Sequence, residues 1–302
     1  MSAGLALLLV LQAQTPPYSD TATAALIARA RARHHQQDAA VRDYRATLRT
    51  RLDVSVGRGR FSRILPVGMQ EQEAELHWQA PNDLRIVALG RRSRSAYPNI
   101  EVGVSWTRPW FVARFLGDSI RLLGRHGFPR RAAIHPLAPG AENFYRYAIT
   151  DSMELALPGH TVRAIRVQVT PTRPEESLIA GDLWLDRETA ETVRLAFVFV
   201  GQRLWVDSAG PAEPNAARTR RARALAARIL RVSADLEYGL YEQRYWLPYH
   251  QAVTLDVEMP WLKNLVVPVR FITTFRGVRV NQGAPIGFVT SPGDTTRVRG
   301  CA

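Results

Sequence analysis

The sequence is poor in cysteine and in lysine. Its single cysteine, Cys301, is the penultimate residue, which excludes a disulfide within one chain and a cysteine-rich metal site. Lysine occurs only at Lys263, so arginine supplies the rest of the positive charge behind a formal net charge of +13. If this charge reports a partner, the partner is anionic; codon composition is the alternative explanation.

Sequence motifs for catalysis and metal binding are missing as well. There is no Gly-x-Ser-x-Gly and no His-Glu-x-x-His, and the adjacent pair His34 and His35 points to different sides of a helix. One polar and aromatic cluster, from His135 to Tyr145 and Tyr147, leaves a hydrolase interpretation open; a loop that closes one end of a sheet is the more usual role. No phosphate loop or nucleic-acid motif accompanies the arginines. We therefore expect no cofactor, no metal, no catalysis and no nucleic-acid partner.

Long hydrophobic runs are absent after the first residues, where a membrane-spanning helix would need ~20. The run from Ala3 to Leu11 is too short to span a bilayer but suits the core of a secretory signal, with Ala13 before the cleavage point. No basic residue precedes it, so the run is either part of a longer signal or a fortuitous leader. We expect residues 1–17 to be a signal peptide and the protein to be exported, to the periplasm or the periplasmic face of the outer membrane.

Alternation of apolar and polar residues is the main pattern that is present. It is clearest from Tyr44 to Val56, where only a β-strand puts all the apolar side chains on one side. Weaker alternation predicts further strands, including the hairpin strands around Pro81 and strands at 144–149, 162–169, 183–186, 192–200, 229–238, 245–258 and 266–280. The alanine- and arginine-rich segment 22–41 predicts a helix before the first long strand. The pattern predicts a mainly β fold in one domain, residues 18–281, and a flexible tail, residues 282–302.

Alternation stops between Gly90 and Gly140. Such a stretch, with only a short helix expected near Phe111 to Leu123, is unusual inside a compact domain. We interpret residues 91–140 as an insertion that packs over the sheet or into it. Its aromatic residues Trp106, Trp110 and Phe111 are candidates for a lid.

A second arginine-rich segment, residues 216–228, predicts a short helix without an acidic residue. Its arginines repel one another unless an anion or water screens them. They suit the head groups of an anionic membrane surface, and a solvated loop is the alternative. The members of this group are Arg218, Arg220, Arg221, Arg223 and Arg228.

Two hairpin motifs resemble those of periplasmic lipoprotein carriers of the LolA type. The first runs from Leu76 through Pro81 to Leu84, Arg85 and Ile86; the second runs from Gly181 through Asp186 to Thr189. The helix before the first long strand also matches that family, and the resemblance covers roughly residues 22–90 and 160–280. The 91–140 insertion, the arginine-rich segment and the size of the chain depart from it.

The resemblance implies a strongly curved antiparallel sheet, an incomplete barrel of about nine to eleven strands, that curls around a helix. Its concave apolar face would hold lipid or lipoprotein acyl chains, and arginines at the rim would attract an anionic head group. The alternative is an interaction or sensor module in which the same face holds a partner polypeptide. The residues that we expect to line the cavity are Leu183, Leu185, Leu195, Phe197, Phe199, Phe271 and Phe275.

Overall fold

The computed structural model describes residues 16–56, 65–81, 83–95, 110–112, 115–123, 128–157, 160–175, 177–200, 205–206, 228–259 and 265–283. Several sequence-based predictions fall outside these ranges. They are the signal peptide up to residue 15, Trp106, the arginine-rich helix up to residue 227, and the tail from residue 284.

A single α-helix, α1 (Thr21–Ala40), opens the described chain, as the sequence predicts. The Asp20 carboxylate caps its first turn by accepting a hydrogen bond from the backbone N–H of Thr23 at 2.6 Å. The helix ends at Ala40, because Val41 already has an extended backbone. Leu26, Ile27 and Ala30 form its buried stripe.

Long antiparallel strands make up most of the rest. They are β1 (Asp43–Val56), β2 (Leu65–Gln79), β3 (Asp83–Ser95), β7 (Tyr145–Leu157), β8 (His160–Pro171), β9 (Ile179–Asp186), β10 (Thr192–Phe199), β12 (Arg228–Tyr241), β13 (Tyr245–Met259) and β14 (Leu265–Val280). The short elements are β4 (Phe111–Val112), β5 (Ser119–Leu123), β6 (Phe128–Ile134), β11 (Trp205–Val206) and the 3-10 helix η2 (Ala141–Asn143).

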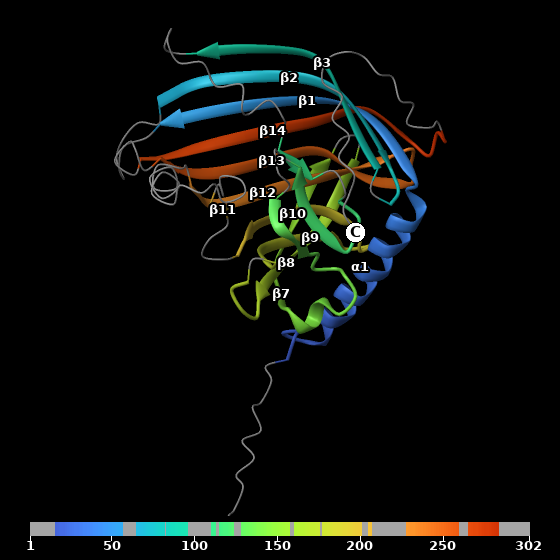
Figure 1. Cartoon of the computed structure of the whole chain (residues 1–302). Helices are drawn as coiled ribbons and strands as arrows, with labels where there is room; N and C mark the ends of the chain where they lie inside the picture. The colour runs from blue at the N-terminus through green and yellow to red at the C-terminus, as the bar shows by residue number, and fades with distance from the viewer. Residues whose placement is uncertain are drawn as a thin grey trace, which may run out of the picture.

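The strands form one large open sheet and one small sheet. The large sheet has eleven strands in the order β3-β2-β1-β14-β13-β12-β10-β9-β8-β7, with β11 paired to β12 alongside this path. The last strand of the chain, β14, pairs with the first, β1, while β3 and β7 form the two edges. The small sheet has the order β4-β5-β6. The predicted fold class, a curved antiparallel sheet with an N-terminal helix, is confirmed (Figure 1).

The register of the strands defines two faces of the large sheet. Phe271 of β14 lies opposite Leu52 of β1 and Val253 of β13, and all three side chains are buried. We call this buried surface the inner face. The alternate residues, such as Arg270 opposite Asp53, form the outer face. In Figure 1 the sheet curves, α1 runs along one side of the curve, and the green strands of the small sheet lie within it.

The small sheet corrects the prediction of a helix near Phe111 to Leu123. This segment instead contains β4 and β5, which pair antiparallel, with Phe111 opposite Leu123. Gly117 and Asp118 break the segment in its middle, and Ile120 and Leu122 alternate with polar residues in β5. Strands form here because the apolar residues of each half need only one buried face.

Helix α1 contacts the turns at the ends of several strands. The Gln37 side-chain amide donates hydrogen bonds to the Glu191 carboxylate, after β9, and to the backbone C=O of Arg244, after β12. Arg31 forms an ion pair with Glu142 at 2.7 Å. These contacts fix the helix across one end of the sheet. Among the described residues, no helix is long and apolar enough to cross a membrane.

Candidate functional site

The residues that we expected to line a cavity all lie on the inner face. Leu195 of β10 is opposite Leu183 of β9, and Phe199 is opposite Ile179. Phe275 of β14 is opposite Leu48 of β1. Every predicted lining residue is buried, and the set is Leu183, Leu185, Leu195, Phe197, Phe199, Phe271 and Phe275. The structure therefore brings them onto the same buried face of the sheet, and their role in ligand binding stays a prediction.

Gly181 allows two neighbouring strands to approach closely in this surface. It lies opposite Phe197, and a Cβ atom at Gly181 would meet the backbone O of Ala196 and lie 2.7 Å from the Cα of Phe197. Only glycine fits such an approach without moving the backbone. The glycine of the second hairpin motif thus has a defined packing role.

Aromatic residues of the insertion cover part of the inner face. The ring of Trp110 stacks on Phe271 with centroids 6.2 Å apart, and Phe111 meets Phe275 edge-to-face at 6.1 Å. Both insertion residues are buried. Phe115 follows the same pattern against Tyr238, at 6.1 Å. The insertion therefore packs into the curve of the sheet, in contact with two of the predicted lining residues.

One glutamine side chain holds β4 against the inner face. Gln251 of β13 is almost fully buried, with 1% of its surface exposed. Its side-chain oxygen accepts a hydrogen bond from the Val112 N–H at 2.8 Å, and its side-chain nitrogen donates to the Val112 C=O at 2.9 Å. The amide thus replaces a strand neighbour for β4. Gln251 was missed in the sequence, although its position in the buried parity of β13 is the signal that could have found it, because buried polar groups need partners.

Polar residues continue beside Gln251 as a band across the inner face. Gln251 lies opposite Thr273 of β14, which lies opposite Thr50 of β1. The two threonine hydroxyls share a hydrogen bond of 3.0 Å, and both side chains are buried. Gln72 of β2 comes next in the register. The band separates the apolar surface beside α1 from the apolar surface around Leu52 and places hydrogen-bonding groups between them.

Two histidines stack where α1 meets the small sheet. The rings of His34 and His135 are 4.3 Å apart and nearly parallel. Nε2 of His34 lies 3.3 Å from the Gly117 C=O, and Nδ1 of His135 accepts a hydrogen bond from the Leu137 N–H at 3.0 Å. Burial lowers the pKa of His135 well below its usual value, and the charges of His34 and His35 lower it further. This stack joins the helix, the insertion and the segment after β6.

The hydrolase interpretation required His135 beside a serine and a carboxylate. Its described contacts are instead a backbone N–H and the His34 ring. Nearby, the Tyr145 hydroxyl donates to the Ile134 C=O at 2.7 Å, and the Tyr147 hydroxyl donates to the Pro136 C=O at 2.7 Å. Burial raises the pKa of both phenols. These tyrosines fasten the segment after β6 to β7. Within the described ranges, no group of three or more His, Cys, Asp or Glu residues is placed to hold a metal ion.

The arginine-rich segment contributes only its last residue to the described structure. Arg228 begins β12 and lies opposite Glu258 in the register, so this position belongs to a strand. Arg218, Arg220, Arg221 and Arg223 lie outside the described residues. The predicted anionic-surface role of this segment stays a prediction.

Known proteins offer weak similarities in structure. No protein-family model matches the chain, and no curated protein sequence is similar to it. A DUF1329 family protein from Desulfovibrio piger is 12% identical, with 90% of this chain and 96% of that chain covered and a TM-score of 0.33. An outer membrane lipoprotein-sorting protein domain from Vibrio parahaemolyticus is 11% identical, with 86% and 93% covered and a TM-score of 0.30. A LolA superfamily protein from Nitrosomonas europaea is 6% identical, with 85% and 93% covered and a TM-score of 0.32.

The TM-scores are too low to transfer a ligand or an activity to this chain. The functional argument therefore rests on the inner face itself.

Proposed function

We propose that the inner face binds the hydrophobic part of a lipid or lipoprotein, without catalysis. The observation that carries the proposal is how β4 is held in place. Trp110, just before β4, covers Phe271, and Phe111 of β4 covers Phe275, while the Gln251 side chain takes the place of a strand neighbour for this two-residue strand. A cover held in this way can leave without breaking a ladder of the large sheet. An acyl chain would then occupy the apolar surface that Trp110 and Phe111 now cover.

The free energy of this exchange favours a long acyl chain. Returning one large apolar side chain to water costs about 1.5–3 kcal/mol, and burying one methylene contributes about 0.8 kcal/mol. By these values about four to eight buried methylenes offset the exposure of Trp110 and Phe111, and each further methylene adds to the affinity. A chain shorter than about four carbons would not offset it, so the site should prefer long-chain lipids.

The polar band supports an amphipathic ligand. Thr50, Thr273 and Gln251 place hydroxyl and amide groups in the middle of an apolar surface. Buried ester oxygens of a lipid need such partners. A pure hydrocarbon would form no hydrogen bonds with the band.

We place this function in the envelope, in the periplasm or at the periplasmic face of the outer membrane. The apolar run from Ala3 to Leu11 supports export. A partner polypeptide is the alternative occupant of the inner face, as in an interaction or sensor module. A lipid carrier should retain lipid when it is purified in its native form, whereas an interaction or sensor module should not.

Mass spectrometry of organic extracts from the natively purified protein tests the proposal. We expect retained lipid, and uptake of a fluorescent long-chain fatty acid after lipid removal. Gln251→Leu leaves the backbone groups of Val112 without their partner and should speed this uptake. Gln168→Leu makes the same change at an exposed outer-face position and should leave uptake unchanged.

Two outcomes would overturn the proposal. The first is that the natively purified protein carries no lipid and that neither the parent nor either variant takes up fatty acid. The second is uptake that Gln251→Leu and Gln168→Leu change equally, since uptake would then not depend on β4. A tightly held peptide in the native protein would favour the sensor alternative.

A further inference from the structure

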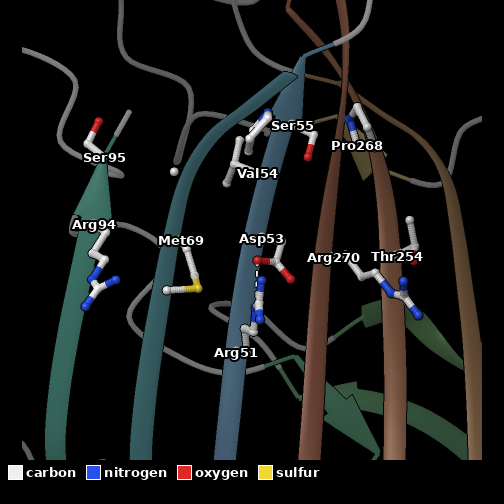
Figure 2. Close-up of a pocket in the computed structure, with 12 residues that line it drawn as sticks. Arg51, Asp53, Val54, Ser55, Met69, Arg94, Ser95, Thr254, Pro268 and Arg270 are labelled. Carbon is white, nitrogen blue, oxygen red and sulfur yellow. Dashed lines mark hydrogen bonds and ion pairs between the residues drawn. The ribbon is translucent and has the colours of Figure 1, made fainter. Parts of the chain in front are cut away.

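A hollow lies on the outer face, near the ends of the strands β1, β2 and β3 that are away from α1. Its floor is one row of residues that face one another across the sheet: Arg94 of β3, Met69 of β2, Asp53 of β1, Arg270 of β14 and Thr254 of β13. The volume of the hollow is about 680 Å³. Figure 2 shows these side chains, which have the opposite parity to the buried Leu52 and Phe271. The hollow is therefore separate from the inner face.

The charge of the hollow is positive. Arg51, Arg94 and Arg270 line it, and Asp53 is its one acidic residue. The Arg51 Nε donates to the Asp53 carboxylate at 2.8 Å, so this pair is neutral as a unit (Figure 2). Among the described residues, neither Arg94 nor Arg270 forms an ion pair. The positive charges of Arg94 and Arg270 thus remain, one on each side of Met69 and Asp53 in the row.

Some outer-face arginines have acidic partners. Arg194 meets Asp235 through two hydrogen bonds, of 2.8 and 2.6 Å. Arg166 pairs with Asp182 at 2.8 Å. Among the arginines that line the hollow, Arg51 has an acidic partner, whereas Arg94 and Arg270 have none within the described part of the chain. An anion from outside would supply one.

The spacing and the lining select the class of anion. Arg94 and Arg270 are three strands apart, or roughly 14 Å between backbones at about 4.8 Å per strand. In Figure 2 the Arg270 side chain extends toward Thr254, so a phosphate between the two arginines requires both flexible side chains to turn inward. Guanidinium groups bind phosphate oxygens through paired hydrogen bonds. The Thr254 hydroxyl can donate a further hydrogen bond. Met69 and Pro268 provide apolar surface beside the charges.

We propose that this hollow binds a phosphate ester, with its phosphate between Arg94 and Arg270 and its less polar part against Met69 and Pro268. Such a group comes either from a lipid head group or from a small phosphorylated compound. The site is independent of acyl-chain binding on the inner face, because the two surfaces lie on opposite sides of the sheet.

Binding of two probes by the full-length protein distinguishes the two sources. One probe is glycerol 3-phosphate, followed by calorimetry. The other is vesicles of phosphatidylcholine with and without phosphatidylglycerol, followed by sedimentation. The test variant is Arg94→Gln with Arg270→Gln. The matched control, Arg49→Gln with Arg92→Gln, removes the same charge from the same face of β1 and β3, at the two arginines that share Glu71.

We expect the test variant to lose roughly tenfold or more in affinity, as removing two arginines from a phosphate site should. The control should stay near the parent, and added salt should weaken binding by the parent. Binding of both probes would identify a phosphorylated compound in general, and binding of the vesicles alone a lipid head group. All four residues are exposed, so thermal unfolding should show that both variants fold.

The proposal fails if the parent binds neither probe. It also fails if the control and the test variant lose affinity equally, because the net charge of the outer face would then explain binding. Neither result would bear on fatty-acid uptake by the inner face, which the Gln251→Leu variant measures separately.

Discussion

The inner and outer faces of the large sheet satisfy their polar groups in different ways. On the inner face the buried polar side chains of the band meet uncharged partners, as Thr50 meets Thr273 and Gln251 meets Val112. On the outer face the partners are charged and partly exposed, as with Arg166 and Asp182. The same strands carry both patterns, because consecutive side chains point to opposite faces.

This difference bears on which contacts specify the structure. A buried amide that loses its partner carries a full desolvation penalty, so Gln251 fixes where β4 can lie. An exposed ion pair that breaks is largely compensated by water. The inner face should therefore determine stability and the position of the insertion, while the outer face is free to exchange its ionic partners.

The largest expected effect on stability comes from comparing alanine substitutions at two adjacent residues that point to opposite faces of the sheet. Phe271→Ala removes a buried ring that contacts Trp110, and we expect a loss of about 3–5 kcal/mol in the free energy of unfolding. Ile272→Ala, at the next position, changes the half-buried outer face and should cost about 1 kcal/mol. Urea denaturation of both variants measures the difference. Equal losses would mean that the two faces do not differ as described.

A second pair of variants compares glycines on the two faces. An alanine at Gly181 brings its Cβ against the backbone of Ala196 and Phe197, which should cost about 1–3 kcal/mol. Gly90 of β3 lies opposite Glu73 on the outer face, and nothing lies within 4 Å of its added Cβ. Gly90→Ala should raise stability by about 0.5–1 kcal/mol, since it restricts the unfolded chain. Opposite shifts of the thermal midpoint are the expected result; shifts of the same sign would contradict it.

The sequence predicts the long elements well because their patterns are long. Alternation from Tyr44 to Val56 gives β1 to within one residue, and the prediction of helix 22–41 differs from α1 by one residue at each end. The parity of Phe271 and Phe275 also places them on the buried face. An alternation that is repeated many times predicts an element more reliably than any single residue does.

The contacts between distant segments could not be predicted in the same way. Strand β4 has two residues, too few to show a period, and its partner Gln251 is 139 residues away from Val112 in the sequence. The outer-face hollow depends on the pairing of β1 with β14, which brings Asp53 beside Arg270. Alternation tells which face a residue occupies, but register across the chain decides its neighbours.

Lowering the pH should reduce the stability of the fold through the buried histidine stack. The pKa of His135 is lowered by burial, so the unfolded chain binds this proton more readily than the folded chain does. Stability is then full above the ordinary histidine pKa of 6.5 and falls below it, by up to about 1.4 kcal/mol per pH unit. His135→Phe keeps a ring against His34 and removes the titrating group, so urea midpoints between about pH 7.5 and pH 5 should vary less. An unchanged pH slope in the variant would exclude His135 as its source.

The smallest effect is expected on the outer face, at Glu71. Its carboxylate accepts a hydrogen bond from Arg92 and lies near Arg49, and the Arg92 hydrogen bond first, then the arginine charges, lowers its pKa. Because the folded pKa is the lower one, the stabilisation is present above the ordinary value of 4.5 and is lost as the pH falls below it. Glu71→Gln should therefore lower stability only slightly at neutral pH, less so in high salt, and converge with the parent in acid. Urea midpoints at two salt concentrations measure this. A loss as large as that of Phe271→Ala would show that outer-face charges, too, specify the fold.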